Sequence, residues 1–305
     1  MRDRVTEYAE ATAAGEGFCG ELHRLACKRH LADLARQRTA DFPYYWDAEA
    51  AERVLEYAET LTIAEGAEPR PVQLIPSQVF DIGCTFGWKK TVNDCRRFRR
   101  RYKSMARQNG KTFENGIIGT YVAGFSGYHH GKLFTVATKK RQARLAWEEM
   151  AKFVRVDPDL GELFKVRDYK SVIEAPGTGC SIEALSREAG LDDGFRPIFC
   201  SVDEIHQHKD NKVYKALYNG TRSLPETLVS MITTRGDQLN SFSFVFRFAV
   251  SHVFSSFLVR ATARMKPQRL SKEGKGGEMP GNQRSAATSS RRWPHFCCFC
   301  DYYKS

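Results

Sequence analysis

The chain has 305 residues, of which 42% are hydrophobic and 27% are charged, a composition typical of a globular protein and unlike that of a disordered or fibrous one. No apolar run reaches the roughly 18 residues that a membrane-spanning helix needs, so we expect neither secretion nor membrane insertion. The nine cysteines do not follow the pattern of a small disulfide-bonded scaffold, which favours a reduced, cytoplasmic protein.

The net charge of +11 is distributed unevenly along the chain. Residues 243–305 hold 11 Lys/Arg and 3 Asp/Glu, a net charge of +8, whereas residues 1–242 hold 36 and 33, a net charge of +3. The basic excess therefore belongs to the last segment, and the overall charge is a poor argument for binding of nucleic acid.

Residues 1–66 predict a small helical segment that packs on a larger body. They contain 13 acidic and 8 basic residues and are rich in Ala, Glu and Leu, which favours helix. One helix is expected over residues 18–36. A second is expected after Asp47, which can cap it, with apolar side chains at three- and four-residue steps from Ala51 to Leu61.

From residue 70 onward, short apolar runs alternate with helical patterns and Gly-rich turns, which predicts an α/β sheet that is at least partly parallel. We expect a helix over residues 140–155 and a hairpin through residues 176–179. The expected strands are residues 132–137, 171–175, 180–184, 197–202 and 227–233.

The tripeptide Gly110-Lys111-Thr112 matches the end of the phosphate-binding pattern G-x-x-x-x-G-K-[ST]. The glycine lets backbone N–H groups approach phosphates, the lysine reaches them, and the hydroxyl binds Mg²⁺. A helix beginning near Thr112 would point its N-terminus at the phosphates. The match is incomplete, because Met105 stands where the pattern has its first glycine.

A strand that ends in Asp203-Glu204 follows about 90 residues later in the chain, a spacing that leaves room for the strand–helix units of a P-loop fold. An aspartate there can hold Mg²⁺, and the next carboxylate can activate a water molecule. Each motif alone is common; their order and separation predict an ATPase with additional strands between the two motifs. An ordinary strand entering an acidic turn is the alternative for Asp203-Glu204 taken by itself.

Two further segments are weaker candidates. The strand over residues 227–233 ends in Thr233, Thr234 and, after Arg235, Gly236; hydroxyl groups there could sense the γ-phosphate, or the segment is an ordinary strand end. Gln78 lies about 30 residues before the Gly-Lys-Thr motif. Its amide can pair with an adenine edge, although glutamine is also a routine surface residue.

Residues 89–111 contain ten Lys/Arg and one acid, Asp94. This segment predicts either a phosphate-gripping surface or a solvated basic helix with no specific role. Arg107 stands apart, because its position within the loop should keep it near the nucleotide phosphates.

From about residue 15 to about residue 242, the chain resembles the large subunit of tailed-phage terminases, the DNA-packaging ATPase. Its resemblance rests on the full set of motifs in this order. They are Tyr45-Trp46-Asp47, Pro76-Ser77-Gln78, Phe86-Gly87-Trp88, Arg96-Arg97-Phe98-Arg99, residues 106–112, residues 137–143, Val202-Asp203-Glu204 with His206, and Thr233-Thr234-Arg235-Gly236.

The resemblance implies a P-loop NTPase domain (RecA-like, with an additional strand) whose sheet is flanked by helices, and ATP and Mg²⁺ as its ligands. By that resemblance, Lys111, Glu204 and Arg107 are catalytic, with Glu204 as the base. The nucleotide is bound by Gln78, Asn109, Gly110, Lys111 and Thr112, and Mg²⁺ by Thr112 and Asp203. Thr233, Thr234 and Gly236 couple hydrolysis to motion.

The resemblance also implies the partners of a packaging motor in the cytoplasm of a bacterial host. They are double-stranded DNA, a terminase small subunit, a portal and procapsid, and further copies of the chain in a ring. No membrane is involved. Another P-loop motor, such as a helicase, or an inactive remnant that binds nucleotide or DNA remains the alternative.

The tail, residues 243–305, departs from the family, whose members carry a nuclease domain with clustered carboxylates. The tail holds only Glu273, Glu278 and Asp301 as acidic residues. We expect a poorly ordered basic tail after a helical segment (1–66) and an ATPase domain (67–242), in a truncated, prophage-derived form. The composition change near residues 240–242 suggests a shift of reading frame.

Overall fold

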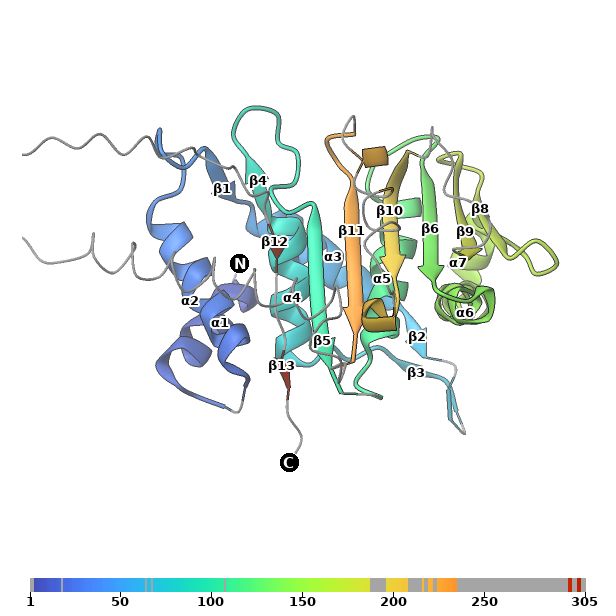
Figure 1. The fold of residues 1–305 in the computed structure, drawn as a ribbon, viewed down its shortest axis with the longest axis horizontal. Helices are drawn as coiled ribbons and strands as arrows, with labels where there is room; N and C mark the ends of the chain where they lie inside the picture. The colour runs from blue at the N-terminus through green and yellow to red at the C-terminus, as the bar shows by residue number, and fades with distance from the viewer. Residues whose placement is uncertain are drawn as a thin grey trace, which may run out of the picture.

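The computed structural model describes residues 3–17, 19–63, 65–66, 68–106, 108–186, 196–207, 216, 219–221, 224–234, 296–297 and 301–302. Within these residues, a nine-stranded sheet runs through the molecule in the order β12-β5-β11-β10-β6-β9-β8-β7, with β13 also on β5 (Figure 1). Its central strands are β5 (Arg100–Met105), β11 (Leu228–Thr233), β10 (Pro197–Val202), β6 (Lys132–Ala137) and β9 (Cys180–Ser186). Beyond β9 lie β8 (Val172–Ala175) and the edge strand β7 (Lys165–Arg167). At the opposite edge, β12 (Phe296–Cys297) and β13 (Asp301–Tyr302) lie beside β5.

The sheet is largely parallel, as the alternation of strand and helix patterns predicted. β5, β11, β10, β6 and β9 are parallel neighbours, whereas β8 and β7 are antiparallel. The strands predicted over residues 132–137 and 197–202 have the observed bounds, and the predicted hairpin joins β8 to β9. The α/β fold class is therefore confirmed.

β11 lies between β5 and β10. The strand before Gly110-Lys111-Thr112 and the strand before Asp203-Glu204 are therefore separated in the sheet by one strand, β11, which follows both motifs in the chain. Because all three strands are parallel, their carboxyl ends meet at one edge of the sheet, where open α/β sheets bind ligands.

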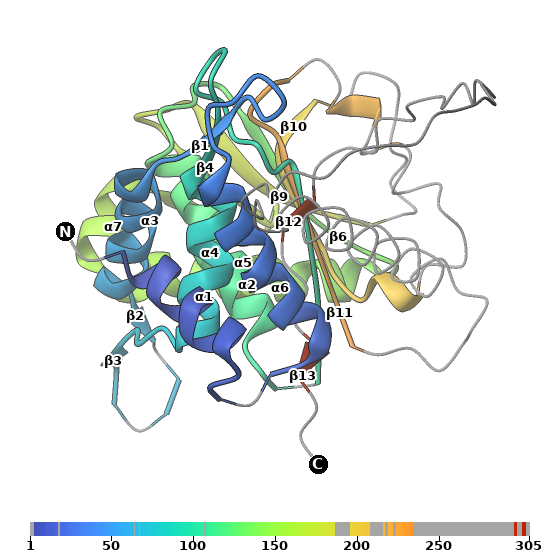
Figure 2. The same ribbon diagram turned by 90° about the vertical axis from the view of Figure 1, so that its left-hand side faces the viewer.

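The helices of the described chain lie on one face of this sheet (Figure 2). They are α1 (Arg4–Ala14), α2 (Glu21–Ala35), α3 (Ala48–Thr60), α4 (Pro76–Gly87), α5 (Lys111–Gly124), α6 (Lys140–Val156) and α7 (Pro158–Leu163). Two small sheets accompany them, one of β1 (Tyr44–Trp46) with β4 (Trp88–Lys90) and one of β2 (Thr62–Ile63) with β3 (Arg70–Pro71). A 3₁₀ turn, η2 (Ile205–Gln207), follows β10. No helix in the described ranges is long and apolar enough to cross a membrane.

Helix α3 packs as its apolar periodicity predicted, whereas the buried face of α2 is formed mainly by His23, Cys27, Arg29, His30 and Asp33. The Asp47 carboxylate accepts a hydrogen bond of 2.9 Å from the Ala50 N–H and caps α3. Each apolar position from Ala51 to Leu61 that follows the helical period is buried. The pattern missed α1, whose apolar stripe consists of the small or short side chains of Val5 and Ala9.

Both interpretations of the basic segment 89–111 are wrong for five of its ten cations. The segment forms β4 and β5 instead of a helix. Arg96, Arg97, Arg100, Arg101 and Lys103 are all 8% exposed or less, so they neither face solvent nor form a phosphate-gripping surface. Carboxylates from other elements neutralise Arg96, Arg97, Arg101 and Lys103: Arg97 Nη1, for example, lies 2.6 Å from Asp33 Oδ2.

His30 on α2 is a buried neutral base. Its Nδ1 accepts a hydrogen bond of 3.0 Å from the Trp88 indole N–H, and its Nε2 lies 3.0 Å from Thr6 Oγ1. The ring is 1% exposed. Burial lowers the pKa of His30 to about 4, although the Asp3 charge opposes this shift.

We expect the His30 ring to make folding less favourable at acid pH. The unfolded chain takes up a proton near pH 6.5 and the folded chain only near 4, so stability is lost as the pH falls through this window. The maximum contribution is about 3 kcal/mol. Urea unfolding at several pH values, compared with that of His30→Gln, measures it. A wild-type profile that parallels the variant's would contradict the expectation.

Candidate nucleotide-binding site

The loop after β5 has the backbone that a phosphate-binding turn requires. Gly110 ends it in a left-handed conformation, with φ +70°, and is the N-cap residue of α5. Gln108 is also left-handed, with φ +61°. The N-terminus of α5 therefore opens onto this loop, and the backbone N–H groups at a helix N-terminus favour an anion there. Arg107 lies outside the described residues.

Lys111 is the first residue of α5, as the motif predicted. Its ammonium donates hydrogen bonds of 3.0 Å to the Met105 carbonyl and 2.8 Å to the Ala106 carbonyl, at the end of β5. The side chain is 7% exposed, and two carbonyl partners stabilise its charged form in this position. Asn109 and Thr112, on either side of Gly110 and Lys111, are partly exposed.

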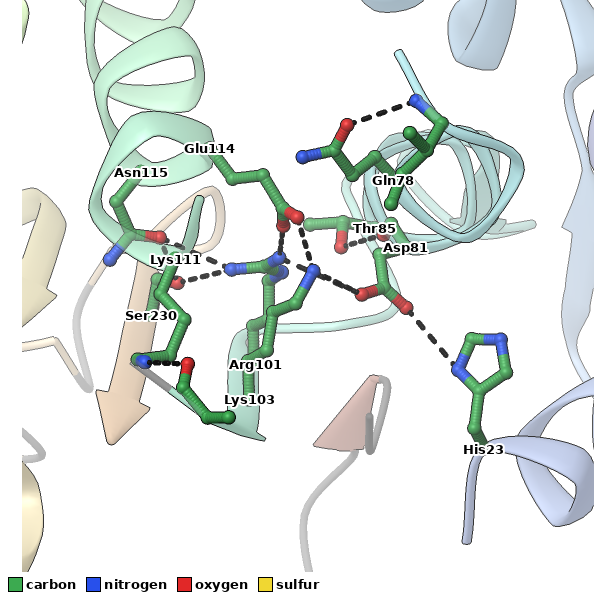
Figure 3. A network of polar contacts seen from close by, with 12 residues as sticks. His23, Gln78, Asp81, Thr85, Arg101, Lys103, Lys111, Glu114, Asn115 and Ser230 are labelled. Atoms are coloured by element: carbon green, nitrogen blue, oxygen red, sulfur yellow. Dashed lines mark hydrogen bonds and ion pairs between the residues drawn. The ribbon is translucent and has the colours of Figure 1, made fainter. Parts of the chain in front are cut away.

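Gln78 reaches the same loop from α4. Its Oε1 accepts a hydrogen bond of 3.0 Å from the Ile75 N–H, which caps α4 at its N-terminus. Its Nε2 would lie 3.3 Å from a Cβ on Gly110, so the amide packs directly against the loop (Figure 3). The structure thus brings Gln78 and Gly110 together across 32 positions of sequence.

Asp203 and Glu204 follow β10 directly. The pKa of Asp203 is raised to about 6, mainly by burial and also by the negative charge of Glu204. A hydrogen bond from the Glu204 N–H and the positive charge of Lys111 oppose this shift. The Glu204 N–H donates a hydrogen bond of 2.7 Å to Asp203 Oδ1. Glu204 itself has φ +46°, a strained conformation for a residue with a side chain, of the kind found at functional sites.

Glu204 also contacts the end of β11. Its Oε2 accepts hydrogen bonds of 3.3 Å from both the N–H and the hydroxyl of Thr234. Thr233 is fully buried, and its hydroxyl donates to the Thr234 carbonyl at 2.9 Å. The structure therefore joins two of the predicted coupling residues to the predicted base. Gly236 and Arg235 lie outside the described residues.

A buried ionic cluster beneath the loop was not predicted. Glu114, in the first turn of α5, forms ion pairs with both Arg101 and Lys103 of β5 (Figure 3). Lys103 Nζ lies 2.9 Å from Asp81 Oδ2 of α4. All four side chains are at most 1% exposed, and two cations face two anions.

The sequence did carry a signal for this cluster. Arg101 and Lys103 are two residues apart in a strand and point to one face of it. Glu114 lies in the first turn of α5 and Asp81 in the second turn of α4. The composition of residues 89–111 does not reveal the pattern, because the acids that neutralise Arg101 and Lys103 lie outside this segment. The cluster fixes α4, β5 and α5 around the loop.

These residues fit a nucleotide with Mg²⁺. No group of three or more His, Cys, Asp or Glu that could hold a metal occurs in the described part of the chain, but Mg²⁺ commonly takes one or two protein oxygens together with substrate phosphates. Thr112 and Asp203 supply such oxygens, and Lys111 and the open N-terminus of α5 supply positive charge. Gly110 leaves the backbone accessible.

We expect Gly110→Ala to weaken nucleotide binding. The new Cβ would sit at positive φ, a cost of about 1 kcal/mol, and would press on Gln78 Nε2. Gly127→Ala is the matched control, because Gly127 has φ +75° but no atom within 4 Å of its Cβ position. Calorimetric titration with ADP should show a loss of affinity in the first variant only, at similar thermal stability. Equal losses in both would contradict it.

Comparison with known proteins relates the chain to one family of ATPase domains. A family model, the ATPase domain of the terminase large subunit, matches residues 76–244. The fold is similar to the crystal structure of the HK97 bacteriophage large terminase, with a TM-score of 0.57 and 20% identity over 68% of this chain and 42% of that one. A structure of the Thermus phage P74-26 large terminase ATPase domain has a TM-score of 0.38 and 16% identity, over 46% and 62%. No curated protein sequence matches.

Proposed function

Because the chain belongs to the family of terminase large subunit ATPase domains, we propose that it hydrolyses ATP with Mg²⁺ and thereby drives double-stranded DNA into a phage procapsid. The observation that carries this proposal is the meeting of three strand ends at one edge of the sheet. There Lys111 acts electrostatically on Asp203, and Glu204 bonds to Thr234.

Each residue has a distinct role in this proposal. Gly110 and the N-terminus of α5 bind the phosphates, Lys111 and Arg107 neutralise them, and Asn109 and Gln78 hold the rest of the nucleotide. Thr112 and Asp203 hold Mg²⁺, which when bound neutralises charge on the phosphate oxygens. Glu204 accepts a proton from the attacking water.

Coupling to motion follows from the contact between Glu204 and Thr234. A change of the Glu204 side chain during hydrolysis would alter two hydrogen bonds to the end of β11. Thr233, Thr234 and Gly236 would pass this change to the chain beyond residue 236, toward bound DNA.

The partners of this protein would be those of a packaging motor in the cytoplasm of a bacterial host: DNA, a terminase small subunit, a portal and procapsid, and further copies of the chain in a ring. The chain spans 42% of the length of the HK97 terminase. We propose that this chain cuts no DNA, since residues 243–305 hold only Glu273, Glu278 and Asp301 as acidic residues.

Phosphate release by the purified chain tests the proposal, with and without double-stranded DNA and Mg²⁺. Lys111→Ala is expected to reduce hydrolysis by at least about 100-fold, the usual cost of losing a charge-stabilising donor. Lys152→Ala is the matched control, because its ammonium pairs with Glu65 and Glu149 and Lys152 is not among the residues proposed to bind the nucleotide. A folded wild-type chain without Mg²⁺-dependent hydrolysis would refute the enzyme assignment and leave a non-hydrolysing relic.

A further inference from the structure

A row of polar side chains crosses the buried sheet. Arg101 of β5, Ser230 of β11, Ser201 of β10 and Thr135 of β6 are aligned as direct neighbours in the strand register. All four are fully buried. Polar groups placed this deep require partners, and three of the four find theirs in one residue of α5.

Asn115 bridges this row. Its Nδ2 donates a hydrogen bond of 2.8 Å to Ser201 Oγ, and its Oδ1 accepts one of 2.7 Å from Ser230 Oγ and one of 3.2 Å from Arg101 Nη1. Arg101 also donates to Ser230 at 3.1 Å. Figure 3 shows Asn115 reaching from α5 toward Ser230 and Arg101, beside the ionic cluster. One amide thus joins α5 to three strands.

The bridge connects α5 to the three strands whose ends form the proposed nucleotide site. Asn115 lies one helical turn after Lys111, Ser201 lies two residues before Asp203, and Ser230 lies three residues before Thr233. We infer that Asn115 is a positioning residue, which holds the phosphate-binding end of α5 in register with the ends of β10 and β11. It thereby sets the separation of Thr112 and Asp203, the two proposed ligands of Mg²⁺. The inference rests on the proposed function.

The chemistry of the bridge suits this role. An amide offers a donor and an acceptor in fixed geometry, so a slide of α5 along the sheet would break several hydrogen bonds at once and leave buried groups unsatisfied. An apolar residue at this position would pack against the strands without fixing the register. Residues that orient a metal site in this way change metal affinity or activity by about 10- to 100-fold when replaced.

Calorimetric titration with ADP, in EDTA and in Mg²⁺, tests the inference without relying on turnover. The variants are Asn115→Ala, Ser201→Ala, their combination, and Asn115→Asp, which keeps the acceptor and loses the donor to Ser201. Thr135→Val is the matched control, because this equally buried hydroxyl of the same row bonds to the Ala143 carbonyl of α6 and not to Asn115.

Each of the four variants is expected to bind ADP in EDTA with an affinity within about twofold of the wild type. The increase in ADP affinity on addition of Mg²⁺ should be about tenfold smaller than in the wild type. Because the two side chains act as one unit, the double variant should lose no more than either single one. Thr135→Val should keep the full gain at a similarly lowered unfolding temperature. If Asn115→Ala does not fold, Asn115→Asp and Ser201→Ala carry the test.

Three results would overturn the inference. An unchanged Mg²⁺ gain in Ser201→Ala and Asn115→Asp, an equal loss in Thr135→Val, or additive losses in the double variant would reduce Asn115 to a structural role. In each case a wild-type chain that hydrolyses ATP leaves the proposed function intact. A wild-type chain that binds no ADP would refute both.

Discussion

Replacement of Glu204 by Gln is expected to reduce ATP hydrolysis by about 100- to 10,000-fold, the range for loss of a general base. Gln has the shape of Glu and can still accept hydrogen bonds from Thr234, so nucleotide binding should change little. The amide cannot take a proton from water, which removes the chemical step alone. Phosphate release, together with ADP titration of the same preparation, separates the two effects.

Glu174→Gln provides the control for this experiment. Glu174 lies on β8, next to the edge strand β7, and is partly exposed and 3.5 Å from Arg167 Nε; the same chemical change there should leave hydrolysis unaltered. If Glu204→Gln hydrolyses ATP at the wild-type rate, another group is the base. If it fails to bind ADP, the negative charge of Glu204 is needed to form the site, and the loss of hydrolysis does not identify Glu204 as the base.

Replacement of Glu114 by Ala is expected to destabilise the chain by about 3–5 kcal/mol, the cost of removing one partner from a buried ionic group. Arg101 and Lys103 would then face Asp81 as the one anion left in the cluster, with all three side chains at most 1% exposed. Equilibrium unfolding in urea measures the loss.

Two comparisons make this result specific. Glu49→Ala removes a glutamate whose side chain is 86% exposed and 4.0 Å from Arg53, and should change stability by less than about 1 kcal/mol. The pair Lys103→Met with Glu114→Gln keeps the cluster neutral and should cost less than the sum of the two single changes. A loss in Glu114→Ala as small as that in Glu49→Ala would contradict a stabilising role for the cluster.

The sequence alone determined the α/β class, because short apolar runs such as residues 132–137 and 197–202 alternate with longer helical patterns. It also placed the motif residues at strand ends: Asp203-Glu204 follows β10 directly, and Gly110-Lys111-Thr112 follows β5 after residues 106–109. These features are local. A strand end places its next residue at the edge of the sheet whatever the rest of the chain does.

Only the tertiary structure decided which polar residues are buried and which residues, far away in the sequence, are their partners. Arg101 and Lys103 read as surface cations because their neutralising partners, Asp81 and Glu114, come from other elements. The Asn115 bridge and the Glu204–Thr234 contact likewise depend on the strand order, which sets β11 between β5 and β10. The sequence gives the number of charged side chains that need a partner when they are buried. The packing of elements that are distant in sequence decides which partner each of them has.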